Sequence, residues 1–402
     1  MTAWIESLRE QALKELPILK LPTAERTPIG KWDFESLKGN NDNAPKIEGI
    51  PASVSHLIGD EQDNTIVVSD GQIVFKNLSS DFEDVIIAPI GEAFASHEEV
   101  IKPHFNEIAP FYANRLTAVN LLNQNSGLLI FVPRNKVVAE ALNVIYLQQD
   151  ASLVNRNLVI TGQSSQLKYI ETYVNELEAP AILITEIAVG ENSQLEMVST
   201  DRLSAGVTAY SRRQAAVQAN GRFSFSHAAL SDGNVVTENR ASLMGAGASA
   251  EVRTVAISEM EQKQNITIKV EHLAPHTTGN IINHGISKDK AALVFNGIGK
   301  IHSGMRGSDA QQESRVMMLS ETSTALANPF LLIDEYDVTA GHAASVGKID
   351  EDQLYYLMSR GLSRREAETL IIHGFLMPFI EGIENKTTQE ALGRVIIDKI
   401  NP

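Results

Sequence analysis

The residues with the clearest chemical potential in this 402-residue chain are its ten histidines, because imidazole titrates near neutral pH and binds transition metals. His342 stands alone in the segment Asp337–Gly361, DVTAGHAASVGKIDEDQLYYLMSRG, where a run of small and β-branched residues changes into a helical pattern. It could be a metal ligand or a proton-transfer group. It could also be a structural histidine, hydrogen-bonded in a turn between strand and helix, which is the commoner case for a lone histidine. Residue type and spacing leave both interpretations open.

The densest group of histidines is His272, His276 and His284, in VEHLAPHTTGNIINHG. A spacing of four residues would place the first two on one face of a helix, as in many zinc sites. Pro275 lies between them, however, and no glutamate follows His272. On a strand, the even spacing would share one face only if the run were unbroken. The pattern therefore gives only weak support to a metal site here.

Other catalytic patterns are missing or unconvincing. Residues 245–250, GAGASA, match G-x-G-x-x-A, but a strand is expected at 251–257 where a dinucleotide site needs a helix, so they are interpreted as a tight corner. The sequence contains no phosphate-binding loop motif and no nucleophile elbow, so the chain alone is not expected to hydrolyse nucleotides. It also has no cysteine, which excludes disulfides, thiolate nucleophiles and metal centres built from its own thiolates.

The net charge of −16 argues against a nucleic-acid or anionic-membrane ligand, since both require a cationic surface. The first residues, MTAWIESLREQALKELPIL, are charged throughout and do not resemble a signal peptide. No apolar run approaches the length of a membrane span. We therefore expect a cytoplasmic protein.

The elements that would position these residues change character along the chain. Residues 1–126 predict a mixed, mainly helical region. Between 127 and 345, short apolar and β-branched runs alternate with glycine corners at 162, 190, 221 and 245, which fits coils of several short strands each, as in a parallel β-helix. Residues 346–402 predict a helical domain. Within the first region we expect a helix over 4–16, an extended segment over 21–34, a hairpin of 65–68 with 72–75, a strand at 85–90 and two helices between 98 and 123.

The C-terminal helices carry capping signals. Asp350 with Gln353 and Ser363 with Glu366 both fit helix starts, and Gly361 fits the left-handed position that ends the first helix. A third helix is expected after Thr387. The first helix carries more aromatic residues than one narrow buried stripe needs. Those residues could pack inside the chain or dock a partner.

Several runs resemble the SufB/SufD family of SUF-system iron–sulfur cluster assembly proteins. The resemblance covers roughly residues 127–383, and an N-terminal run also looks like the family's. Members of the SufB type supply a cysteine and tend to carry an acidic residue after the turn histidine. This chain has no cysteine and has Ala343 at that position, so it looks more like the other branch. The runs that carry the resemblance are LPTAERTPIGKWDF, FNGIGKI, DAQQESRVMMLS, GHAASVGKI and DEDQLYYLMSRGLSRREAETLIIHGFL.

The resemblance implies a mainly β fold, with a right-handed parallel β-helix core flanked by N-terminal and C-terminal helical regions. It implies a non-enzymatic subunit that pairs with SufB through the β-helix and docks the ATPase SufC through its C-terminal helices. It further implies that His342 faces SufB and helps to hold a nascent iron–sulfur cluster that this chain alone does not bind stably. The isolated chain is expected to form a homodimer. The residues expected to contact SufC are Leu354, Tyr355, Met358, Arg360 and Leu362.

Two alternatives remain at this stage. A β-helix enzyme acting on acidic polysaccharide would need carboxylates or basic residues clustered on one coil face, and no such set is recognisable. A purely structural subunit would leave His342 without a chemical role.

Overall fold

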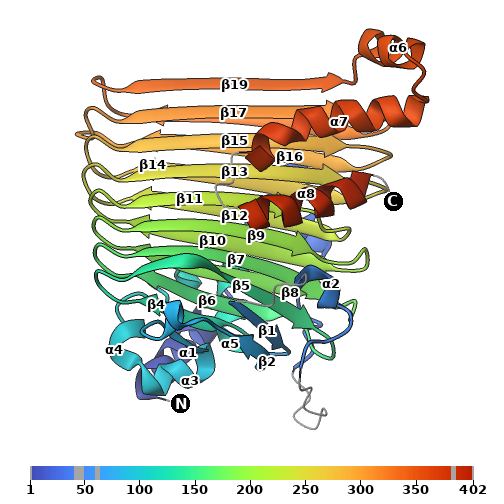
Figure 1. Cartoon of the computed structure of the whole chain (residues 1–402). Coiled ribbons are helices and arrows are strands. Elements are labelled where there is room, and N and C mark those ends of the chain that lie inside the picture. Colours follow the sequence, from blue (N-terminus) through green and yellow to red (C-terminus); the bar gives the residue numbers. More distant parts are fainter. Residues whose placement is uncertain (1, 40–48, 59–63, 382–385, 401–402) are drawn as a thin grey trace.

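The computed structural model describes residues 2–39, 49–58, 64–381 and 386–400. Its core is a parallel β-solenoid of about eight turns, in which two sheets face each other across a closed interior (Figure 1). Each turn adds one strand to each sheet, so a strand pairs with the strands one turn away and not with its neighbour in sequence. The predicted mainly β architecture, a parallel β-helix with helices at both ends, is confirmed.

The two sheets have regular compositions. Sheet A contains the hairpin β1 (Thr65–Ser69) and β2 (Gln72–Asn77), then β5 (Val137–Gln148), β7 (Gln166–Asn175), β9 (Gln194–Arg202), β11 (Arg222–Ala229), β13 (Ser249–Ser258), β15 (Thr278–Ser287), β17 (Asp309–Met318) and β19 (Thr339–Lys348). Sheet B contains β3 (Ile86–Pro89), β4 (Leu128–Val132), β6 (Val154–Thr161), β8 (Ala181–Val189), β10 (Thr208–Val217), β12 (Asn234–Leu243), β14 (Lys263–His272), β16 (Ala292–Ile301) and β18 (Thr324–Ile333).

The coils differ from the expected pattern in one respect. Each has two long strands, most of ten residues, where several short strands were expected. Polar residues at inward positions, such as Glu171 and Arg213, break the apolar alternation and make a long strand look short in sequence. The glycine corners are confirmed. At Gly245 a Cβ atom would lie 2.2 Å from the backbone nitrogen of Ala219, one turn away, so only glycine fits there.

Most of the N-terminal helices cover the outer face of sheet B in the first turns, whereas the short helix at 55–58 packs against β1 and β5 of sheet A. Ile5, Phe94 and Phe105 form one apolar cluster with Leu158 and Ile160 of β6. The predicted hairpin of β1 and β2 is confirmed, and β1 extends sheet A by pairing in parallel with β5. Among the described residues, no helix is long and apolar enough to cross a membrane. The helices of this region are α1 (Ala3–Glu15), η1 (Ile29–Lys31), α2 (Ser55–Ile58), η2 (Ser80–Phe82), α3 (Ile90–Ser96), α4 (Glu98–Ile101), η3 (Phe111–Ala113) and α5 (Arg115–Asn123).

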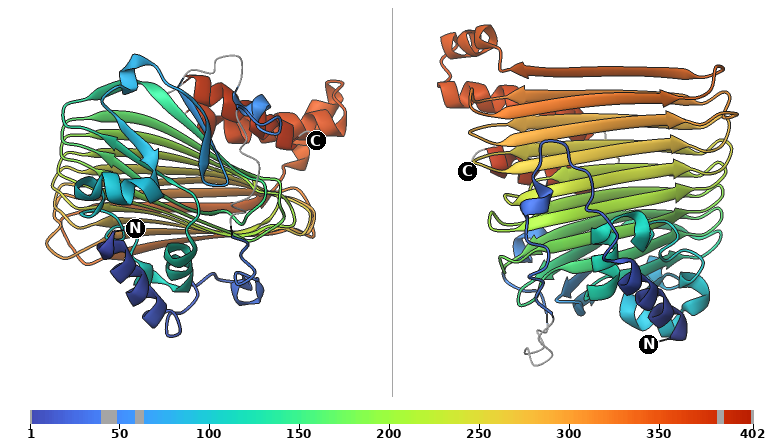
Figure 2. Two further views of the ribbon diagram at one scale, coloured as in Figure 1. Left: turned by 90° about the horizontal axis from the view of Figure 1, so that it is seen from below. Right: turned by 180° about the vertical axis from the view of Figure 1, so that it is seen from behind.

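The segment expected to be extended, 21–34, runs along the outside of sheet B and contains only the short helix η1 (Figure 2). Ile29 and Phe34 pack in one cluster with Val154 and Ile182. Further along, the amide of Asn265 donates to the carbonyl of Glu25 at 2.8 Å. The segment therefore ties the helical N-terminus to later turns of the solenoid.

The C-terminal helices are α6 (Glu351–Ser359), α7 (Arg364–Glu381) and α8 (Lys386–Ile400). The Asp350 carboxylate accepts from the first-turn N–H groups of α6, and Gly361 has φ +98°, as the capping pattern predicts. The pair Ser363 and Glu366 caps α7 reciprocally. Helices α7 and α8 lie across the outer face of sheet A, where Leu376 and Phe379 share a cluster with Val255 and Ile286 (Figure 1).

Charged side chains lie inside the solenoid. The Arg213 guanidinium donates to Glu171 at 2.8 Å and to Asp201 at 2.6 Å, and Asp201 also contacts the ring of His227 at 2.9 Å. All four residues are at most 2% exposed. Burial alone would raise the pKa of Asp201, but Arg213 and His227 outweigh burial and hold that pKa well below its ordinary value. The cluster is therefore stable only as a complete ionic set.

We expect Arg213→Met to lower the free energy of unfolding by about 3–5 kcal/mol, because it leaves two buried carboxylates without their cation. The matched control is Arg253→Met, which removes the ion pair with Glu251 on the outer face of sheet A. That pair is partly exposed, so the control should cost at most about 1 kcal/mol. Urea unfolding of both variants checks this, and equal losses would contradict an essential buried network.

Candidate functional site

His342 occupies the last rung of a row of inward-facing residues. The sheet A register pairs it with Gln312 on β17, which pairs with Ile281 on β15 and then with Val252 on β13. Those three residues are at most 6% exposed, whereas the side chain of His342 is exposed. A turn between strand and helix was considered for His342, but the residue lies within the strand β19. The parallel pairing of β19 with β17 continues the ladder by one more turn, so that interpretation was wrong.

The last turn forms an open edge, which we define as β18 and β19. Each is the outermost strand of its sheet in the described part of the chain, and β19 is the top strand in Figure 1. Such strands present unpaired backbone N–H and C=O groups. The edge also exposes apolar side chains: Phe330 is 44% exposed, Leu332 48% and Val346 41%. Exposed apolar area along an unpaired edge is typical of a pairing surface.

The immediate surroundings of His342 do not form a metal site by themselves. Among the described residues, no group of three or more histidines, aspartates or glutamates could hold a metal ion. The neighbouring Gln312 on β17 donates from its amide to the carbonyl of Phe330 on β18 at 2.9 Å, which links the edge strand β18 to the strand below β19 across the interior. His342 can therefore contribute one imidazole ligand, and a metal ion would need its other ligands from another molecule.

The three clustered histidines do not converge. His272 points into the interior at the end of β14, with 0% exposure, and its Nδ1 lies 2.8 Å from the Thr277 hydroxyl. His276 lies in a turn with φ +57°. His284 lies on the outside of sheet A, where its ring centre is 5.1 Å from that of Phe375 on α7. These positions agree with the weak support for metal binding in the sequence.

Helix α6 presents an exposed aromatic surface. Tyr355 is 75% exposed, Tyr356 56% and Met358 41%. The Arg360 guanidinium lies 5.1 Å from the ring centre of Tyr356 and donates to its hydroxyl at 3.2 Å. Leu354 does not belong to this surface, because it is 1% exposed and packs with Ile349 and Ala367.

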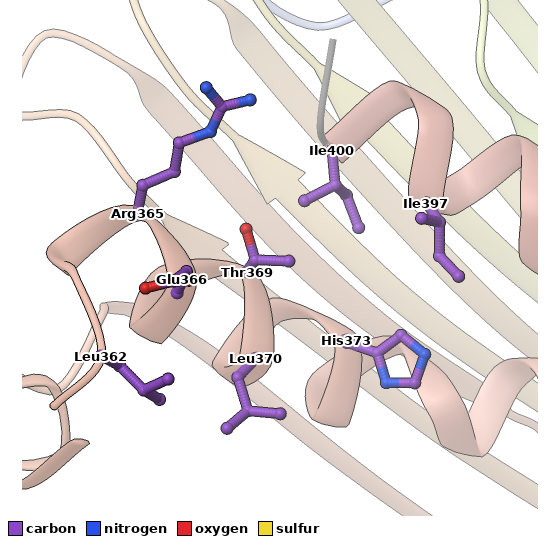
Figure 3. Close-up of a pocket in the computed structure, with 8 residues that line it drawn as sticks. All are labelled: Leu362, Arg365, Glu366, Thr369, Leu370, His373, Ile397 and Ile400. Carbon is purple, nitrogen blue, oxygen red and sulfur yellow. The ribbon is translucent and has the colours of Figure 1, made fainter. Parts of the chain in front are cut away.

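Leu362, also expected at the partner surface, borders a mainly apolar groove between α7 and α8. The groove has a volume of about 390 Å³, and Figure 3 shows residues of both helices facing it. It is close in sequence to the exposed surface of α6. Its lining residues are Leu362, Arg365, Glu366, Thr369, Leu370, His373, Ile397 and Ile400.

Sequence reasoning missed two parts of this site. One is the apolar edge at Phe330 and Leu332, although the run PFLLI at 329–333 is apolar on both strand faces and could have indicated it. The other is the polar interior beneath His342, which includes Gln312. Inward polar residues cannot be told from outward ones until the register is known.

Fold and site together define a class of protein: a β-solenoid subunit with one covered end, one open edge and a single histidine on the last rung. The family described as SUF system FeS cluster assembly, SufBD core domain, matches residues 144–375, and the SufBD protein N-terminal region matches residues 60–144. The chain belongs to this family.

Individual relatives agree with this assignment. The chain is 37% identical to the iron–sulfur cluster assembly protein SufD of Bacillus subtilis, over 99% of this chain and 94% of that protein. It is 26% identical to an iron–sulfur cluster assembly SufBD family protein of Staphylococcus saprophyticus, over 77% of this chain and 68% of that protein. The predicted resemblance to the branch without the cysteine, that of SufD, is confirmed.

The buried His272 makes stability depend on pH. Burial lowers its pKa from 6.5 to about 4, so between these values the unfolded chain binds a proton that the folded chain does not. Stability should therefore fall as the pH falls through this window, with a contribution from His272 of about 2 kcal/mol between pH 7 and pH 5. Urea midpoints at both pH values check this. His272→Gln should show a smaller loss than the natural chain, and an equal loss would contradict the assignment.

Proposed function

We propose that this chain is a non-enzymatic scaffold subunit that assembles iron–sulfur clusters together with SufB and the ATPase SufC. The observation that carries the proposal is the position of His342, exposed on the last rung of a solenoid whose final turn has an unpaired edge. The cluster is cargo, formed transiently between two chains.

The chemistry at His342 requires a second chain. Iron–sulfur clusters are held mainly by thiolates, and this sequence has no cysteine. A neutral imidazole can complete the ligand set where a partner supplies thiolates. SufB-type chains carry the cysteine that this chain lacks, so pairing at the open edge would bring thiolate and imidazole to the same place.

The open edge is the surface proposed for SufB. Its exposed residues Phe330, Leu332 and Val346 are apolar, and its strands have free backbone groups that a second β-solenoid could pair with or cover. In the absence of SufB, the same edge could pair two copies of this chain. The expected homodimer and the expected heterodimer would then be mutually exclusive.

The exposed surface of α6 is the region proposed for SufC. Tyr355, Tyr356 and Met358 are residue types enriched at protein interfaces, and Arg360 extends the same surface. Helix α6 follows β19 directly and lies beyond the C-terminal end of that strand, to the side of the sheets (Figure 1). ATP hydrolysis by SufC would then act on the pair of solenoids from this side.

His342→Ala should leave the unfolding midpoint unchanged, because the side chain is exposed, and should still allow co-purification with SufB and SufC. Iron and sulfide recovered with the complex should fall by about tenfold or more, as losing one ligand of a metal site commonly does. The matched control is His302→Ala, a histidine outside the row whose Nε2 atom lies 2.7 Å from a carboxylate oxygen of Glu271. Normal iron and sulfide in the His342 variant would remove this residue from the site and leave a purely structural subunit.

Tyr355→Asp should weaken SufC binding, because it places a charge in a surface proposed to become desolvated. Tyr112→Asp provides a control of the same type, since Tyr112 is 61% exposed in the N-terminal region. Calorimetric titration with SufC should give a dissociation constant at least about tenfold higher for the first variant only. Equal affinities for the two variants would place the SufC surface elsewhere.

The isolated chain should have twice its sequence mass by light scattering. Phe330→Glu should convert it to a monomer, because a carboxylate would be buried in the apolar edge contact. A monomeric natural chain would show that the edge does not pair two copies.

A further inference from the structure

A row of polar residues runs through the interior of the solenoid toward the open edge. The sheet A register stacks them on six successive strands, so each lies next to the following one. All are at most 3% exposed. We name this set the polar row, and its members are Glu171, Ser199, His227, Thr254, Asn283 and Ser314.

The lower part of the polar row is well partnered. Glu171 accepts hydrogen bonds from Arg213 and Ser199, and the ring of His227 contacts Asp201 through Nε2 and Asn239 through Nδ1. These residues belong to the buried ionic cluster. The charged groups that face His227 are thus Asp201, Arg213 and Glu171.

The upper part is different. Among the described residues, the Thr254 hydroxyl and the Asn283 Oδ1 atom have no hydrogen-bond partner, although both residues are 0% exposed. Across the interior, the same is true of the Thr237 hydroxyl and the Asn239 Oδ1 atom on β12. Reversing the Asn283 amide would not help, because its nitrogen already donates to Ser314 at 3.0 Å and the reversal would only exchange one unpaired atom for another.

A buried polar atom without a partner also lies next to the open edge. Gln312 lies two residues before Ser314 on β17 and pairs in register with His342. Its Oε1 atom is buried without a partner among the described residues. Gly297 on β16 leaves space for this carboxamide, since a Cβ there would lie 2.5 Å from the same oxygen. Unpaired polar atoms therefore occur on β12, β13, β15 and β17, and the last of them lies one turn below His342.

Buried polar atoms in folded proteins almost always have partners, and where the protein supplies none, ordered water does. A single unpaired atom could be an isolated defect, but five such atoms on four strands of the upper interior indicate that this region needs further hydrogen-bond partners. We propose that the polar row binds a file of buried water molecules that connects the imidazole of His227 with the open edge beside His342. The ligand is water, and the file lets the fully buried His227 exchange protons with solvent.

The file of water molecules belongs to the isolated chain and does not depend on SufB, SufC or a cluster. It does give the interior a role that an apolar core could not have. When another chain covers the open edge, the file of water molecules would still give a polar route through the interior as far as His342.

The first test is a high-resolution crystal structure of the full chain. Ordered water molecules should lie within hydrogen-bond distance of Thr254 Oγ1, Asn283 Oδ1 and Gln312 Oε1. Featureless density at all three positions would overturn the proposal.

The second test uses Thr254→Val, which keeps the side-chain shape and removes the hydroxyl. If water bridges this position, the variant should unfold at a lower temperature, and the ring N–H of His227 should exchange more slowly with solvent by NMR. Thr254→Ser, which keeps the hydroxyl, should retain the natural exchange rate. A higher unfolding temperature in Thr254→Val would mean that a dry, unsatisfied hydroxyl had been removed and would overturn the proposal. So would a ring N–H of His227 that, in the natural chain, exchanges only on global unfolding.

Discussion

Every strand of the parallel ladder takes half of its backbone hydrogen bonds from the turn below and half from the turn above. The last turn has no turn above it, so β18 and β19 keep one unpaired edge in the described chain. A parallel solenoid cannot remove this edge by closing on itself, as a barrel does. At the other end the ladder is continued by the antiparallel strands β2 and β3 and packed by the N-terminal helices, so the edge of β18 and β19 is the one beside His342.

The interior adds a second constraint. Arg213, Glu171, Asp201 and His227 are buried together, and they hold one another in their ionised or hydrogen-bonded forms. Such a set tolerates no slip in register, because moving one strand by a residue would turn each charge from the interior to the surface. A fixed register in the middle turns in turn fixes which residues face inward at the open edge. The position of His342 thus depends on charges several turns away.

Much of this architecture could be predicted from the residues. The glycine corners, the lack of helical periodicity between 127 and 339, and the capping residues Asp350, Ser363 and Gly361 were correctly interpreted from local chemistry. The length of the strands could not be predicted in this way, because inward polar residues such as Glu171 and His227 look like the ends of apolar strands. Leu354 was expected at the partner surface, but it packs inside the chain with Ile349 and Ala367, as an apolar residue on one face of a helix can. The role proposed for His342 came from family resemblance, and its place on a strand came from the register.

The open edge is proposed as the pairing surface at which His342 meets another chain. Hydrogen–deuterium exchange of the backbone amides, measured with and without SufB, tests this claim most directly. Backbone amides of β18 and β19 should become strongly protected in the presence of SufB, while the exchange of amides in α1 and α3 should not change. Protection on the outer faces of the sheets, with unchanged exchange in β18 and β19, would contradict it.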